Sequence, residues 1–297
     1  DIRTMWDSPE VKAFPEYYEQ YFKAAMQFLV RPQPLVCVAP VTYRGQDAVQ
    51  ADIAHLKAAL QQLGPGGVEE AFMPSTAPRS LGRNEYYATE DEFRQAIAEA
   101  IREEYLAIVD AGFILQIDDP ALAHLYSLDG RQSREEKVRT AERYIEIINH
   151  ALRGIPQERV RFHCCYGINE GPRVHDASLR DYVSLMLKIN AAAYSFEVAN
   201  PRHLHEWHVW EDIELPAGKV IIPGMISHAT NIVEHPELIA ELLVNYARLV
   251  GRENVMAGAD CGFSSQATHT PEVHPSVVWA KFRALAEGAR LASQRLW

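Results

Sequence analysis

A histidine and a cysteine at the end of one short apolar segment are the residues of this chain best suited to chemistry. Residues 160–165 have the pattern of a buried strand that ends with His163 and Cys165, before a break at Gly167. Successive side chains of a strand point to opposite faces, so His163 and Cys165 project the same way. One imidazole and one thiolate on the same face supply half of a tetrahedral zinc site.

Two later strand ends offer the missing half of such a site. One predicted strand ends at Glu197, and another ends at Cys261. With His163 and Cys165 they provide one nitrogen, two sulfurs and one oxygen, a donor set that suits a catalytic zinc. Each residue taken alone has a simpler explanation, because buried cysteine often packs as a small hydrophobe. The convergence of three strand ends favours the metal site.

The other cysteines and several histidines are assigned different roles. Cys164 alternates away from Cys165, and Cys37 lies inside a predicted strand, so we expect both to pack against apolar neighbours. Three histidines gather in one segment beyond a strand: His203, His205 and His208. Their spacing could indicate a metallohydrolase, but a solvated or hydrogen-bonded loop is the favoured interpretation.

Polar residues follow two further predicted strands. His228 lies just past a strand end, and we expect it to act as a general acid. Asn231, in the same segment, is expected to contact the substrate. Asp118 and Asp119 end another strand and could cap the helix that follows. Two carboxylates at such an edge are also well placed to bind a substrate ammonium, and we assign Asp118 to the catalytic residues as well.

Strands and helices alternate along the chain in a way that predicts parallel βαβ units. The strands are nearly continuous apolar segments, and their polar residues stand at the carboxyl ends, the functional face of a (β/α)₈ barrel. An open doubly wound sheet is the alternative, although no Gly-x-Gly-x-x-Gly follows a strand. The predicted helices cover residues 17–29, 47–63, 89–111, 134–153, 179–192, 236–250 and 275–292.

Composition narrows the class of protein. The 297 residues suit a single domain, which we assign to residues 1–297 with an inserted excursion at about 64–88. A formal charge of −11 argues against a nucleic-acid surface. We find neither an apolar segment long enough for a bilayer nor a signal peptide. Four cysteines in a chain of this length do not make a disulfide framework, so we expect a cytoplasmic protein.

Taken together, the motifs resemble those of the C-terminal barrel of cobalamin-independent methionine synthase. They occur in the family's order: Gln-Ile-Asp-Asp-Pro-Ala-Leu (116–122), His-x-Cys-Tyr (163–166), Ser-Phe-Glu (195–197) and Asp-Cys-Gly (260–262). The resemblance implies that zinc, bound by His163, Cys165, Glu197 and Cys261, activates homocysteine for attack on the methyl of a methylfolate. It also implies that Asp118 helps to hold the amino group of homocysteine.

The chain departs from this family in several places. The family's first two barrel strands carry a Gly-Ser-(Phe/Leu)-Pro turn and a Gly-Glu pair, and neither motif is in this sequence. We also expect the strand near Ala71 to belong to the excursion, which leaves six strands from Leu35 onward for a barrel that needs eight. We therefore expect an incomplete barrel in this chain, to be completed by an N-terminal piece, by another chain or by a different packing. The family's folate-binding N-terminal half is also absent, and His228 falls one position short of the family's histidine.

The features combine into one prediction, a zinc-dependent transfer of a methyl or alkyl group to a thiol of the homocysteine type on a (β/α)₈ barrel. Similar short proteins include epoxyalkane:coenzyme M transferases, which alkylate another thiol and provide the alternative. A zinc hydrolase ranks lower, because thiolate ligands make zinc less Lewis-acidic. A third hypothesis is a barrel with a purely structural zinc. The expected partners are a small-molecule thiol and an alkyl donor, and the chain could act as a homo-oligomer.

Overall fold

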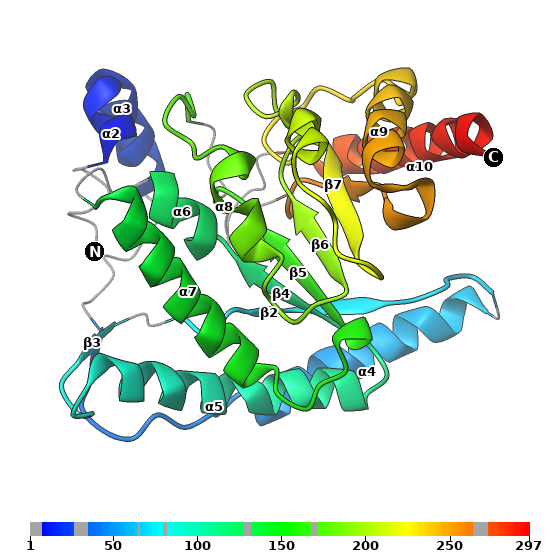
Figure 1. The fold of residues 1–297 in the computed structure, drawn as a ribbon. Coiled ribbons are helices and arrows are strands. Elements are labelled where there is room, and N and C mark those ends of the chain that lie inside the picture. Colours follow the sequence, from blue (N-terminus) through cyan, green and yellow to red (C-terminus); the bar gives the residue numbers. More distant parts are fainter. Residues whose placement is uncertain are drawn as a thin grey trace.

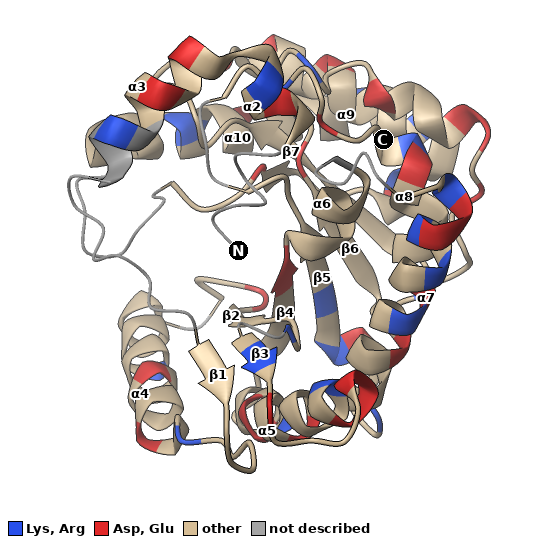
Figure 2. Cartoon of the chain, turned by 90° about the vertical axis from the view of Figure 1, so that its left-hand side faces the viewer, with Lys and Arg blue, Asp and Glu red and all other residues tan. Residues whose placement is uncertain are grey.

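A curled, parallel six-stranded sheet forms the centre of the computed structural model, which describes residues 8–26, 35–64, 66–79, 82–127, 132–167, 171–263 and 273–297. Its strands are, in spatial order, β2 (Phe72–Thr76), β4 (Ile114–Asp119), β5 (Val160–Cys164), β6 (Ala193–Phe196), β7 (Val220–Ile226) and β8 (Gly258–Ala259). The sheet curves into a half-barrel (Figures 1 and 2). The described residues therefore form part of a barrel-like sheet and not a closed barrel of eight strands.

Helices lie on the outer, convex side of the half-barrel (Figure 2). The described helices are α2 (Pro9–Ala13), α3 (Pro15–Met26), α4 (Gln46–Leu63), α5 (Glu90–Asp110), α6 (Ala121–Ser127), α7 (Arg134–Ala151), α8 (Leu179–Met186), α9 (Pro236–Val250) and α10 (Pro275–Leu296). Short 3₁₀ turns occupy η1 (Gln157–Arg159), η2 (Glu206–Glu211) and η3 (Arg252–Asn254). The predicted alternation of strands and helices is confirmed from β4 onward.

Local signals explain where the helices begin. Thr89 caps the start of α5, because its side chain accepts a hydrogen bond from the backbone N–H of Glu92 at 3.1 Å. Ser133 and Glu136 form a reciprocal capping box at the start of α7.

The aromatic rings of Tyr194 and Phe196 on β6 are fully buried in the hydrophobic core.

Two strands near the N-terminus differ from the expected arrangement. We expected the strand near Ala71 to belong to an excursion, but β2 pairs with β4 over its whole length and forms an edge of the main sheet. The apolar segment that starts at Leu35 forms only β1 (Leu35–Cys37), which pairs with β3 (Gly82–Asn84) in a separate two-stranded sheet. The reason lies in burial: Met73 and Ser75 of β2 are buried, whereas Leu35 is 59% exposed. For the same reason Cys37 is only partly buried.

The register of the sheet brings polar residues to one level. Asp118, His163 and Ser195 are direct partners across β4, β5 and β6. In a parallel sheet the side chains of such partners project to the same face. The polar strand ends that the sequence singled out therefore meet at one rim of the half-barrel.

None of the helices in the described segments is both long enough and apolar enough to cross a membrane.

Candidate metal centre

Three of the four predicted zinc ligands lie together at the rim of the half-barrel. His163 is the last but one residue of β5, Cys165 follows that strand directly, and Cys261 lies two residues beyond the end of β8. One ligand atom from each of these residues lies within 4.8 Å of the other two. His163 and Cys165 are buried and Cys261 is partly buried. The curvature of the sheet makes this grouping, because β6 and β7 lie between β5 and β8 in the strand order.

The ring of His163 is oriented by a neighbouring strand. Its Nδ1 lies 3.1 Å from Oγ of Ser195, a buried residue of β6. Its Nε2 is also buried and has no hydrogen-bond partner among the described residues. Metal-binding histidines are commonly fixed in this way through the ring nitrogen that does not bind the metal. The arrangement therefore suits an Nε2 ligand.

A hydrogen bond joins the two cysteines of this group. The hydrogen bond from the Cys165 thiol lowers the pKa of Cys261 to about 4, and the same contact raises the pKa of Cys165. One thiolate is therefore favoured in this group even without a cation. A bound divalent cation would favour deprotonation of the second thiol as well.

Glu197, the fourth predicted ligand, lies in an adjacent cluster in this structure. One of its oxygens lies within 4.8 Å of ligand atoms from both His228 and Asp260. Its Oε1 is 2.7 Å from Nη1 of Arg173, and Asn200 also donates to Oε1, at 3.1 Å. In this structure the Glu197 carboxylate is therefore paired with the guanidinium of Arg173. It does not belong to the group formed by the three other predicted ligands.

Asp118 and Asp119 have different surroundings. Asp118 is partly buried, burial raises its pKa, and Nε2 of Gln116 donates to its Oδ1 at 2.7 Å. Asp119 is fully buried, and its Oδ1 accepts hydrogen bonds at 2.8 Å from both the Ala121 N–H and the Tyr144 hydroxyl. Asp119 therefore caps α6, one of the two roles considered for it from the sequence. Asp118 is the carboxylate that shares a level with His163.

His228 lies next to the candidate metal centre, and Asn231 lies further along the same loop. His228 is 1% exposed, and burial lowers its pKa, which favours the neutral ring. Neither of its ring nitrogens has a hydrogen-bond partner within the described segments. Asn231 is exposed to solvent. His228 therefore lies among the buried candidate ligands Glu197 and Asp260, whereas Asn231 lies at the surface.

The loop after β7 is held by an ion pair that sequence reasoning missed. Lys281 of α10 is fully buried, and its Nζ lies 2.8 Å from Oε1 of Glu234. The same oxygen accepts a hydrogen bond from the backbone N–H of Ser227 at 2.8 Å. Lys281 thereby fixes the segment that carries His228. No pattern in the sequence distinguishes it from the other basic residues of its helix.

The histidines near residue 205 stay outside both clusters of candidate ligands. His203 is buried between Glu206 and Asp176, at 3.0 and 3.2 Å. His208 is exposed and lies 2.8 Å from Glu211. The favoured interpretation of this segment, a hydrogen-bonded loop, is confirmed for these two residues. Cys164 is fully buried in the core, as expected.

The half-barrel is shared with solved methionine synthases. The B12-independent methionine synthase of Shewanella sp. W3-18-1, in complex with selenomethionine, matches with a TM-score of 0.67 and 20% identity over 88% of this chain and 71% of its own. The putative vitamin-B12-independent methionine synthase of Listeria monocytogenes matches with a TM-score of 0.59 and 22% identity over 88% of this chain and 73% of its own. These likenesses show the fold.

Sequence comparison defines the family. The family model described as the catalytic domain of cobalamin-independent synthase matches residues 78–281, and the chain belongs to this family. A methionine synthase of Saccharolobus islandicus is 25% identical over 215 residues, which cover 72% of this chain and 54% of the relative. That of Saccharolobus solfataricus is 26% identical over 216 residues with the same coverage. The chain thus spans about half the length of these relatives, and the resemblance inferred from its motifs is confirmed.

Proposed function

We propose that this protein transfers a methyl or alkyl group to a thiol with the help of zinc, bound through His163, Cys165 and Cys261 and, exchangeably, through Glu197. The observation that carries the proposal is the convergence of one imidazole and two thiols within 4.8 Å. One nitrogen and two sulfur donors suit zinc better than magnesium or calcium. The buried Nε2 of His163 supports the same site, because it has no hydrogen-bond partner in the described part of the chain.

The chemistry supplied by zinc would be to hold the substrate sulfur as a nucleophilic thiolate at neutral pH. Asp118 is the residue that binds the ammonium of an amino-acid thiol such as homocysteine. Its carboxylate is oriented by Gln116 and lies at the level of His163. The substrate is therefore anchored beside the metal ligands.

His228 is the residue that delivers a proton to the leaving group. Burial lowers its pKa and favours the neutral ring, so it must first take up a proton, which the substrate thiol releases as it becomes a thiolate. The carboxylate of Glu197 lies next to it and favours the protonated ring electrostatically, as does the thiolate of Cys261. A transient imidazolium at this place can act as a general acid.

An acceptor assay tests the proposal. Zinc-loaded protein is incubated with a methylfolate or an epoxyalkane as donor and with homocysteine or coenzyme M as acceptor, and thioether products are measured by mass spectrometry. We expect alkylated homocysteine. Coenzyme M has no ammonium, so Asp118→Asn should raise KM for homocysteine about tenfold or more and leave coenzyme M nearly unaffected. Absence of a thioether from every pair, with zinc bound, would refute the proposal.

A further inference from the structure

The Glu197 carboxylate lies in a receptor made of three hydrogen-bond donors. Nη1 of Arg173 lies 2.7 Å from Oε1, and Nδ2 of Asn200 donates to the same oxygen at 3.1 Å. The backbone N–H of Tyr166 donates to Oε2 at 3.2 Å. The side chains of Glu197 and Arg173 are 1% and 8% exposed. Both carboxylate oxygens therefore have hydrogen-bond partners other than the three remaining candidate ligands.

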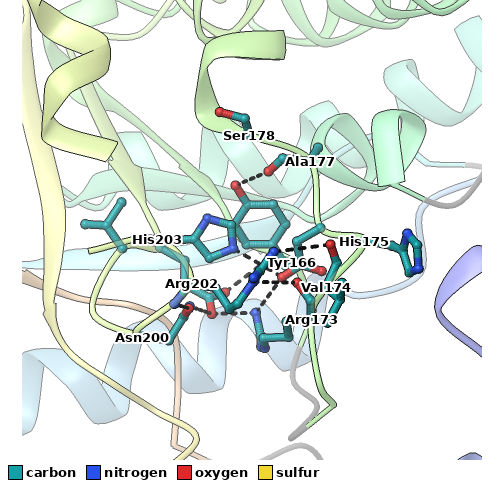
Figure 3. Close-up of polar contacts among 12 residues, drawn as sticks. Tyr166, Arg173, Val174, His175, Ala177, Ser178, Asn200, Arg202 and His203 are labelled. Carbon is teal, nitrogen blue, oxygen red and sulfur yellow. Dashed lines mark hydrogen bonds and ion pairs between the residues drawn. The ribbon is translucent and has the colours of Figure 1, made fainter. Parts of the chain in front are cut away.

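Arg173 is itself fixed by the surrounding loop. It is the one non-glycine residue of the described chain with a positive φ, at 59°. This uncommon conformation persists only where the surroundings enforce it. Arg202 provides such surroundings, because its Nε and Nη2 donate to the carbonyls of Arg173 and Val174 at 3.3 and 3.2 Å (Figure 3). Nη2 of Arg173 also donates to the carbonyl of Gly167 at 3.3 Å.

The charges of the site require such a receptor. Two thiolates and the Glu197 carboxylate together outweigh the charge of one divalent cation, and an arriving thiolate adds a further negative charge. A buried carboxylate that leaves a metal without finding a new partner is strongly destabilised. Arg173 offers that partner inside the protein.

We infer that Arg173 is a positioning residue that receives the Glu197 carboxylate and thereby leaves the fourth metal position open to the substrate thiol. The inference rests on the proposed function. Nη1 of Arg173 also lies 3.4 Å from Asp176, so the guanidinium keeps a carboxylate partner when Glu197 binds the metal. Arg173 is therefore stable in either arrangement, and Glu197 is the group that changes partner.

Cobalt substitution tests this role without an activity assay. Each thiolate that binds Co²⁺ produces a charge-transfer absorption. The increase above the absorption due to Cys165 and Cys261 is titrated with homocysteine and, separately, with coenzyme M. In Arg173→Met the Glu197 carboxylate loses its receptor and stays on the metal, so we expect half-saturation at a thiol concentration at least tenfold higher. The matched control is Arg180→Met, which removes an exposed arginine 2.6 Å from Asp212 and should titrate like the unmodified protein.

A second substitution separates positioning from a structural effect. Glu197→Gln removes the carboxylate that competes with the thiol, so adding Arg173→Met to Glu197→Gln should not weaken thiol binding further. An equal loss in both backgrounds, or no loss in Arg173→Met, would overturn the inference. If Arg173→Met does not fold, Arg173→Gln, which also removes the positive charge, replaces it in both backgrounds. Absence of a thiol-dependent band in the unmodified protein would refute the proposed function and this inference together.

Discussion

Gly224 of β7 lies directly against Asp260, the residue before Cys261. A Cβ atom on Gly224 would stand 2.0 Å from Oδ1 and 2.8 Å from Cα of Asp260. The same Oδ1 accepts hydrogen bonds from the backbone N–H groups of Val198 and Ala199, at 2.9 and 2.8 Å. Asp260 therefore joins the chain after β6 to the chain after β8, and the bare backbone at Gly224 makes room for it.

This contact predicts the effect of a single methyl group. Gly224→Ala should push Asp260 and Cys261 out of place, lowering the free energy of unfolding by about 1–3 kcal/mol and weakening zinc binding. Gly262→Ala is the control, because nothing lies within 4 Å of a Cβ at that position. Urea unfolding and metal analysis of the two variants provide the comparison. Equal stability and equal zinc content in both would show that the contact is unimportant.

The three cysteines near the rim should differ in their effect on zinc content. We expect Cys165→Ser and Cys261→Ser to lose most of the metal, because each removes a thiolate ligand. Cys164→Ser should keep it, since Cys164 is fully buried in the hydrophobic core and alternates away from Cys165. Elemental analysis of the purified variants measures this directly. Zinc retained by both of the first two variants would rule out the proposed ligand set.

Removal of the His228 ring should affect the chemical step. We expect His228→Ala to keep its zinc and its affinity for the thiol, while kcat falls by roughly 10²–10⁴-fold, the range for loss of a general acid. His208→Ala, at an exposed histidine of the 3₁₀ turn η2, is the control and should retain full activity. A variant of His228 with normal kcat would assign the proton transfer to another group.

His203 should make the stability of the protein depend on pH. Burial opposes its charge, but hydrogen bonds with Asp176 and Glu206 outweigh this effect and raise the pKa of His203 to about 9. Because the pKa is raised on folding, the stabilisation is complete below a pH of about 6.5 and is lost as the pH rises through about 9. It amounts to about 3 kcal/mol.

Urea unfolding of the metal-free protein at pH 6.5 and 9.5 measures this contribution. The unmodified protein should lose more stability between the two pH values than His203→Gln, which cannot titrate. Other titrating groups are common to both proteins, so the difference isolates His203. The same pH dependence in both would contradict the raised pKa.

Local patterns explain which elements the sequence could predict. The strand β4 and the helix α9 were both predicted from apolar segments with polar residues, proline or glycine at their ends. The helix α9 has the predicted bounds. The N-terminal strands were predicted less well, because β1 is the more apolar of the two segments, yet β2 joins the main sheet. Strand propensity is a local property, whereas membership of a sheet depends on which edge a strand finds.

By itself the sequence determined which residue types stand at the strand ends and that His163 and Cys165 share one face, because side chains alternate along a strand. Only the tertiary structure decided the partner of each charge. Glu197 lies against Arg173 and Lys281 lies against Glu234, and both pairs join loops or helices that are separate in sequence. The curvature of the sheet likewise brings Cys261 to His163. Such contacts depend on the three-dimensional path of the backbone, which no local pattern of side chains contains.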